Sequence, residues 1–195
     1  MSNVHSILLS GVGGQGTILV SKILTEGLLA GGYDVKMSEI HGMAQRGGSV
    51  STQVRYGEQV DSPIIGPGEA DVLVAFEKME AVRNSQFLKP DGVAVINNLE
   101  IVPLPVASGK VEYPQGLLEA MQANFKVYSF DAMKEALEIG NPKVANVVLF
   151  GAMVEAFPVL QKLEWEEVIA RVVPEKFKEI NLLAFRKGRE LVSHQ

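Results

Sequence analysis

Gly11-Val12-Gly13-Gly14-Gln15-Gly16 is the stretch that decides the fold class. The apolar run Ser6-Ile7-Leu8-Leu9-Ser10 leads into it and predicts a buried strand. After it, apolar residues recur at helical spacing over residues 18–28, and Gly31-Gly32 closes that segment. A second strand is expected over residues 33–38. A strand, a glycine turn, a helix and another strand predict the opening unit of a parallel sheet.

The rest of the chain continues this pattern. Apolar runs of the parallel-strand type cover residues 71–76, 93–96 and 126–130. Helical patterns alternate with them and then close the chain, at residues 79–87, 115–123, 132–139, 142–157, 164–172 and 174–191. We therefore expect an α/β fold over residues 1–195: one Rossmann-like domain with a mostly parallel open sheet flanked by helices, an inserted hairpin and C-terminal helices.

Three segments depart from the alternation of strands and helices. Residues 50–56 alternate in polarity and predict a half-exposed strand, from which Gly57-Glu58-Gln59 would turn into a short strand ending near Pro63. Pro90-Asp91-Gly92 is a turn signal. Residues 99–112 contain two prolines, which cannot donate to a strand ladder, so this segment is predicted to be extended at the sheet edge.

Composition narrows the function classes. Eighteen basic and twenty-three acidic side chains give a net charge of −5, which disfavours general nucleic-acid binding. The chain has no cysteine, which excludes disulfides, thiolate catalysis and an iron–sulfur cluster held by this chain alone. The three histidines show no metal-ligand spacing. The longest apolar run has eight residues, at 147–154, where a membrane helix needs about twenty. No signal peptide is recognisable, so a cytoplasmic location is expected.

The glycine stretch admits two interpretations. It could present backbone to a phosphate-type ligand at a helix N-terminus, or its glycines could only let the helix pack closely on the sheet. Dinucleotide binding also requires an acidic residue about 20 residues after the loop. The nearest acid at a strand end is Glu39, 28 residues after Gly11. That spacing disfavours binding of NAD or FAD.

The stretch Glu39-Ile-His-Gly-Met-Ala-Gln-Arg-Gly-Gly48 gathers four functional side chains among glycines. Arg46 could bind a carboxylate or phosphate with two hydrogen bonds, Gln45 could donate to a carbonyl, and His41 could transfer a proton near neutral pH. Alternatively these groups satisfy one another, with Glu39 paired to Arg46. No residue is assigned a catalytic role, and the candidate ligand-binding set is Gly11, Gly13, Gly14, Gln15, Gly16, Glu39, His41, Gln45 and Arg46.

A third segment carries the family resemblance together with these two. Asn141-Pro-Lys-Val-Ala-Asn-Val-Val-Leu-Phe-Gly-Ala152 opens a long apolar helix, in which Asn146 is expected to tie a neighbouring loop to the helix. With Gly11–Gly16 and Ser38–Ser49, this segment resembles the gamma-type domain of the 2-oxoacid:ferredoxin oxidoreductases. Within that family the chain looks most like the small (beta) subunits of the indolepyruvate enzymes. The resemblance covers nearly the whole chain.

The resemblance implies a subunit that is inactive alone. Enzymes of this family convert a 2-oxoacid and coenzyme A to acyl-CoA and CO2 and reduce ferredoxin. Thiamine diphosphate and the iron–sulfur clusters would then lie in larger partner subunits, and the isolated chain could self-associate through apolar surface. Two other functions stay open from the sequence: a free-standing NAD(P)-dependent oxidoreductase, and a non-catalytic scaffold subunit.

Overall fold

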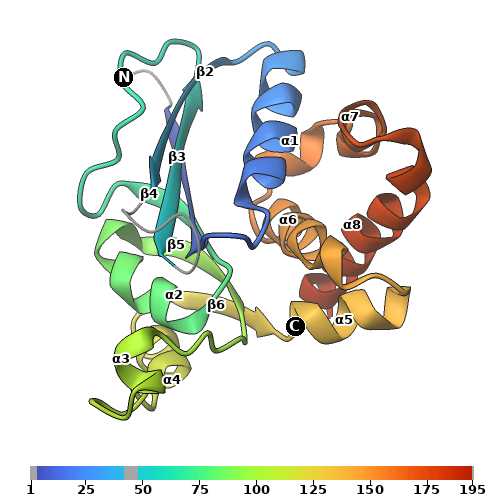
Figure 1. Cartoon of the computed structure of the whole chain (residues 1–195). Coiled ribbons are helices and arrows are strands. Elements are labelled where there is room, and N and C mark those ends of the chain that lie inside the picture. The colour runs from blue at the N-terminus through green and yellow to red at the C-terminus, as the bar shows by residue number, and fades with distance from the viewer. Residues whose placement is uncertain (1–3, 42–47, 195) are drawn as a thin grey trace.

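The computed structural model describes residues 4–41 and 48–194, without the side chain of His41. Its six strands form one sheet in the order β2-β3-β1-β4-β5-β6 (Figure 1). Strands β1, β4, β5 and β6 run parallel, and β3 is antiparallel to both of its neighbours. The strands are β1 (His5–Val12), β2 (Asp34–His41), β3 (Ser49–Gly57), β4 (Ala70–Ala75), β5 (Leu88–Asn97) and β6 (Lys126–Phe130).

Helices cover both faces of this sheet (Figure 1). One layer contains α1 (Thr17–Ala30), α5 (Ala132–Ile139), α6 (Ala145–Ala156), α7 (Trp165–Val172) and α8 (Lys178–Ser193). The opposite face carries α2 (Lys78–Asn84) and α4 (Leu117–Gln122), and α3 (Leu104–Ala107) lies in the segment before α4. Short 3-10 turns complete the list: η1 (Ser85–Phe87), η2 (Pro142–Val144), η3 (Leu160–Lys162) and η4 (Glu175–Phe177). No helix in the described part of the chain is long and apolar enough to cross a bilayer.

The core lies on both sides of the central strand β1. Ile7 and Leu9 pack in the larger cluster with α1, α6 and α8, and Leu8 packs in the smaller one with α2. This alternation is the period-two pattern of a strand buried on both faces. Helix α6 is buried along nearly its whole length, and where it crosses α8 its Gly151 lies against the backbone of Phe185, while Gly188 of α8 lies against the backbone of Val148. The predicted single α/β domain with a mostly parallel sheet is confirmed in its fold class.

The prediction for the segment after Gly57 was wrong. Residues 58–69 contain no strand, and the antiparallel hairpin of this fold is formed by β2 and β3. Side chains take up the backbone N–H groups of the segment: Val60 N donates to Asp34 at 2.8 Å, and Ile65 N donates to the Gln53 amide at 2.7 Å. Because this segment covers one face of β3, Gln53 is buried and the strand is not half-exposed as predicted.

Three other local predictions need correction. Strand β2 does not pair with β1 as a parallel opening unit would suggest, because β3 is inserted between them. The predicted turn at residues 90–92 lies inside β5, where a shift in register from β4 accommodates the extra residues. The segment 99–112 is not extended throughout: α3 forms a helical turn with Pro103 as its N-cap and Pro105 in its first turn. Proline fits there because the first turn of a helix leaves its N–H groups without intrahelical partners.

Candidate functional site

A cleft lies at the carboxyl ends of β1, β4 and β5. There the chain order reverses, from β1 toward β2 on one side and toward β4 on the other, and such switch points are where open α/β sheets bind ligands. This cleft has a volume of about 550 Å³. Its lining comes from the glycine stretch, the strand ends and the start of α6: Gly14, Gln15, Gly16, Phe76, Asn97, Leu99, Ile101, Met133, Pro142, Lys143, Ala145, Asn146 and Leu149.

Glycine is needed at two positions of the loop for different physical reasons. Gly16 is the N-cap of α1 in the left-handed conformation, and a Cβ there would lie 2.5 Å from Nδ2 of Asn146. That amide donates to the Gly16 carbonyl at 3.1 Å, so Asn146 ties the loop to α6 as predicted. Gly14 has a φ of +104°, yet a Cβ there would meet no atom within 4 Å. Gly14 therefore presents backbone to open space, whereas Gly16 is also needed for packing.

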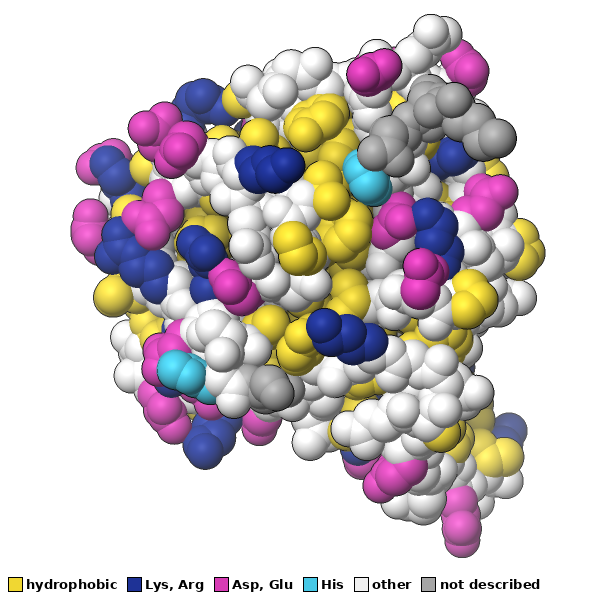
Figure 2. All heavy atoms as spheres, turned by 180° about the vertical axis from the view of Figure 1, so that it is seen from behind, with side chains coloured by type: hydrophobic (Ala, Val, Ile, Leu, Met, Phe, Trp, Pro, Cys, Tyr) yellow, Lys and Arg dark blue, Asp and Glu magenta, His cyan; other side chains and the backbone are white. Residues whose placement is uncertain are grey.

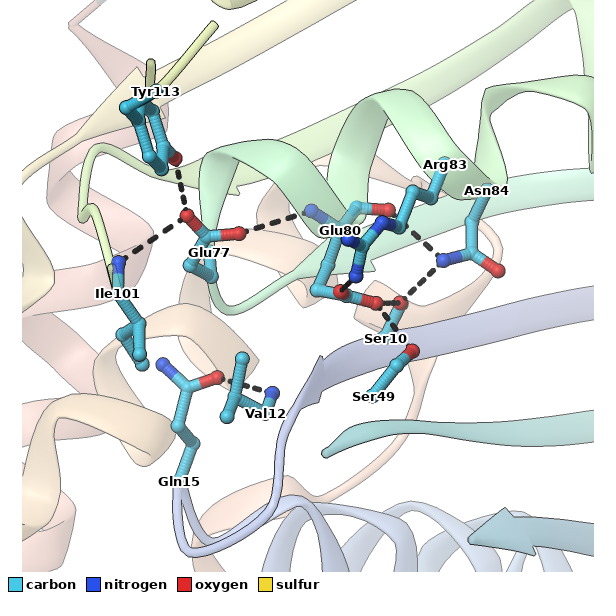
Figure 3. A network of polar contacts seen from close by, with 10 residues as sticks. All are labelled: Ser10, Val12, Gln15, Ser49, Glu77, Glu80, Arg83, Asn84, Ile101 and Tyr113. Atoms are coloured by element: carbon cyan, nitrogen blue, oxygen red, sulfur yellow. Dashed lines mark hydrogen bonds and ion pairs between the residues drawn. The ribbon is translucent and has the colours of Figure 1, made fainter. Parts of the chain in front are cut away.

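The Gln15 side chain holds the loop together. Its carbonyl oxygen accepts from Val12 N at 2.7 Å (Figure 3). Its amide nitrogen donates to the Phe76 carbonyl at 2.8 Å. A Cβ on Gly11 would lie 2.8 Å from the same carbonyl oxygen. Both ends of the amide are thus engaged with backbone or packed against it, which gives Gln15 a structural role at the cleft.

A buried carboxylate anchors the segment that forms one wall of the cleft. Glu77 is 1% exposed and caps α2 by accepting from Glu80 N at 3.0 Å. It also accepts from Ile101 N at 3.3 Å and from the hydroxyl of Tyr113 at 2.5 Å (Figure 3). Burial, followed by the nearby Glu77 carboxylate, raises the pKa of the Tyr113 hydroxyl. The hydroxyl therefore stays protonated and holds the wall segment in place.

A second buried carboxylate contacts Ser49, the residue that follows the polar loop (residues 39–48). Glu80 is 2% exposed, accepts from Ser49 Oγ at 2.6 Å and pairs with Arg83 at 2.6 Å (Figure 3). Ser49 directly follows the predicted polar loop, and the preceding Gly48 carbonyl accepts from Gly13 N at 2.9 Å. The two predicted motifs are therefore adjacent in space where they can be described.

The predicted polar residues separate into two groups. Glu39 lies on β2 and accepts from Ser21 Oγ of α1 at 3.3 Å, and it is not among the residues that line the cleft. Gln45, Arg46 and the side chain of His41 lie outside the described residues. Lys143, Leu99, Ile101 and Met133 also line the cleft and were not predicted as site residues. Lys143 stands in the Asn141-Pro-Lys start of the apolar helix, where a lysine carries no signal of its own.

These features define a Rossmann-like α/β domain with a cleft at its topological switch point. No cluster of potential metal ligands occurs within residues 4–41 and 48–194. The chain belongs to the pyruvate ferredoxin/flavodoxin oxidoreductase family, whose model matches residues 6–191. The family resemblance inferred from the motifs is confirmed.

Individual relatives match over nearly their full length. The chain is 38% identical over 190 residues to the indolepyruvate oxidoreductase subunit IorB of Thermococcus kodakarensis, with 94% of each chain covered. It is 31% identical over 190 residues to the 2-oxoglutarate synthase subunit KorC of Methanothermobacter marburgensis, with 95% of each covered. The solved gamma subunit of a keto/oxoacid ferredoxin oxidoreductase from Geobacter sulfurreducens has a TM-score of 0.73 and 27% identity, covering 98% of this chain and 99% of that one.

Proposed function

We propose that this chain is the small subunit of a 2-oxoacid:ferredoxin oxidoreductase of the indolepyruvate type. The observation that carries the proposal is the 38% identity, over 94% of both chains, to a protein named as a subunit of an indolepyruvate oxidoreductase. Identity to the 2-oxoglutarate synthase subunit is lower, at 31%. That difference favours an aryl 2-oxoacid over 2-oxoglutarate as the substrate of the complex.

In the proposed complex, a 2-oxoacid and coenzyme A become acyl-CoA and CO2, and the two electrons released go to ferredoxin. Iron–sulfur clusters are held mainly by cysteine thiolates, and this chain has no cysteine. We therefore assign the clusters, and the thiamine diphosphate that the reaction needs, to larger partner subunits. This chain would contribute binding surface and would not oxidise the 2-oxoacid alone.

The glycine stretch and the polar loop are the proposed contact for an anionic ligand. Gly13 N donates to the Gly48 carbonyl and joins the two segments, and Arg46 stands two positions before Gly48 in the sequence. A guanidinium can bind a carboxylate or a phosphate through two parallel hydrogen bonds. The 2-oxoacid carries the first group and coenzyme A the second, and Gln45 and His41 would support either contact.

The segment around α3 offers apolar surface to a partner. It projects from the body of the protein at the lower left of Figure 1 and at the lower right of Figure 2. Leu104 is 80% exposed, and Val102 and Val111 are more than half exposed. Apolar side chains gathered on a projecting segment are typical of a surface that a partner covers. We propose that the larger subunit covers it.

The test is co-purification and reconstitution. The chain, co-expressed with the larger subunit from the same source, should form a stable complex that reduces ferredoxin when supplied with an aryl 2-oxoacid and coenzyme A. The chain purified alone should be colourless, contain no iron and show no 2-oxoacid oxidation. A stoichiometric cluster or flavin in the isolated chain, or full activity of the larger subunit without it, would contradict the proposal.

A further inference from the structure

The two ends of the segment that carries α3 meet at one buried oxygen atom. Oε1 of Glu77 accepts from Ile101 N at 3.3 Å and from the Tyr113 hydroxyl at 2.5 Å (Figure 3). These two contacts are called the Glu77 clamp below. Because both ends are held at the same atom, residues 102–112 form a closed loop that projects from the body of the protein (Figure 1).

The start of α2 supplies the rest of the base of this loop. The other oxygen of Glu77 accepts from Glu80 N at 3.0 Å, which fixes the carboxylate to the helix. Lys78 N donates to the Leu99 carbonyl at 3.1 Å, and the Lys78 ammonium pairs with Glu100 at 2.5 Å. One turn of helix therefore holds the whole base. Compact surface loops whose ends lie close together in this way are often functional.

Between its ends, the loop is ordered by its own backbone. Ala107 N donates to the Pro103 carbonyl at 2.9 Å, and Lys110 N donates to the Pro105 carbonyl at 3.0 Å. The two prolines also fix their φ angles at the start of α3, which reduces the conformations open to the loop. Within the part of the chain that the structure describes, each hydrogen bond of residues 102–112 joins two residues of the loop.

The stability of the core does not explain the clamp. Among the described residues, none of residues 102–112 belongs to either hydrophobic cluster, and Leu104, Val102 and Val111 are 80%, 52% and 55% exposed. Glu77 is nevertheless a buried carboxylate, and desolvating such a charge is so costly that an apolar residue is often as stabilising or more so. What the buried charge achieves here is a fixed position for an exposed apolar loop.

The charge of the loop indicates which kind of surface it fits. Its charged side chains are Lys110 and Glu112, which cancel. A neutral loop gains little from the field of a strongly charged partner, such as a nucleic acid or a very acidic protein. Apolar side chains that project from a preformed loop instead resemble the anchor residues of protein interfaces, which fill apolar recesses of the partner.

We infer that residues 102–112 are a preorganised docking loop for an apolar recess of the larger subunit, and that Glu77 and Tyr113 are its positioning residues. This inference rests on the proposed function, because it needs that subunit, and it adds how the surface around α3 is held ready for it. A loop that is ordered before binding loses less conformational entropy on docking. A loop released from the clamp would have to become ordered during docking, so it would associate more slowly.

The first experiment measures association and dissociation rates between the full chain and the larger subunit by surface plasmon resonance. Leu104→Ala should weaken the complex about tenfold, as the loss of an interface anchor does. Tyr113→Phe should slow association about tenfold and change dissociation by less than about twofold, because its hydroxyl contacts Glu77 and not the partner. Tyr128→Phe is the matched control, since the half-buried Tyr128 of β6 has no hydroxyl hydrogen bond within the described residues.

The second experiment tests the clamp in the chain alone. Lys110 is exposed within the loop, so trypsin cleavage after it, followed by mass spectrometry, reports how often the loop opens. Tyr113→Phe and Glu77→Gln should raise this cleavage about tenfold relative to cleavage elsewhere in the chain. Tyr128→Phe should leave it unchanged. The comparison with other cleavage sites separates opening of the loop from a general loss of stability.

The outcomes decide the inference separately from the proposed function. The double variant Leu104→Ala/Tyr113→Phe should bind within about twofold of Leu104→Ala, because positioning has little effect once the anchor is gone. If both single variants bind at the rates of the unaltered chain, or if neither clamp variant is cleaved faster, the inference is wrong and the proposed function stands. Self-association that is lost in Leu104→Ala, with unaltered binding to the larger subunit, would assign the loop to a second copy of this chain instead. If the unaltered chain forms no complex with the larger subunit, both are wrong.

Discussion

Two tyrosines of this protein should respond in opposite directions to the same change, removal of the hydroxyl. Tyr56 is fully buried between the rings of Tyr33 and His5, and its hydroxyl has no hydrogen-bond partner among the described residues. Tyr113 donates its hydroxyl to the buried carboxylate of Glu77 at 2.5 Å. Tyr56→Phe should therefore stabilise the fold, and Tyr113→Phe should destabilise it.

The magnitudes follow from the two environments. Burying a polar group without a partner costs about 1–3 kcal/mol, and we take about 1 kcal/mol as the gain for Tyr56→Phe because a small void replaces the oxygen. A hydrogen bond to a charged group contributes about 1.5–3 kcal/mol. Tyr113 is only partly buried, so water can replace part of its contact and the lower end, about 1.5 kcal/mol, applies. At about 2–4 °C per kcal/mol for a chain of this size, the two variants should differ in Tm by about 5–10 °C.

Thermal and urea unfolding at pH 7, followed by circular dichroism on the full chain, measures both variants. The reasoning is refuted if the two Tm values move in the same direction. A second observable is alkaline pH: desolvation by burial raises the pKa of Tyr56 above its usual value of about 10. The unfolded chain then loses the Tyr56 proton at lower pH than the folded one, so stability falls as pH rises above about 10. Tyr56→Phe should lessen that fall.

Two further predictions concern the helix crossing and the polar loop. Gly188→Ala places a Cβ 1.9 Å from the Val148 carbonyl oxygen, so it should destabilise the fold by about 1–3 kcal/mol in thermal unfolding, although alanine favours a helix by about 1 kcal/mol. As a control, Leu183→Ala on the exposed side of α8 should change the free energy of unfolding by less than about 0.5 kcal/mol. An unchanged Tm for Gly188→Ala would show that the two helices are not in contact. In the assembled complex, Arg46→Ala should weaken apparent affinity for coenzyme A or the 2-oxoacid by about 1.5–3 kcal/mol, tenfold or more, and Gly13→Val by at least as much. The control is Arg171→Ala, because Arg171 is an exposed arginine on α7. If both test variants kept the kinetic constants of the unaltered complex, the glycine stretch and the polar loop would have a structural role only.

The polar face of β3 shows what alternation along one strand can and cannot predict. The alternation over residues 50–56 puts Arg55 on the polar face, which the predicted half-exposed strand would leave open to solvent. In the structure Arg55 donates to the Ile64 carbonyl at 3.0 Å, because the segment 58–69 folds over that face. The period-two pattern distinguishes the two faces of a strand, but it does not show whether a loop from elsewhere in the chain covers the polar one.

Two elements with local signals, α5 and β6, were predictable from the sequence to the residue. Helix α5 spans the predicted residues 132–139, with the Asp131 side chain accepting from Lys134 N at its start and Gly140 in the left-handed conformation at its end. Strand β6 also matches its predicted range. Capping residues and apolar spacing act within a few positions, so a single sequence contains them. The pairing of β3 with β1 joins residues 37 to 51 positions apart in the sequence, from Val12 with Ser49 to His5 with Tyr56, and no local pattern encodes it.

The same distinction explains why Asn146 was predictable and its neighbour Lys143 was not. An amide inside an apolar helix is costly unless it is bonded, so its position alone indicated a contact, which the structure supplies at Gly16. A lysine before a helix is ordinary in sequence. Its significance arises because the ends of β1, β4 and β5 bring no carboxylate to the cleft, and because the glycine stretch leaves α1 uncapped beside it. The charge of a site is the sum over segments that only the fold brings together, and here the lining includes one lysine and no acid in a protein of net charge −5.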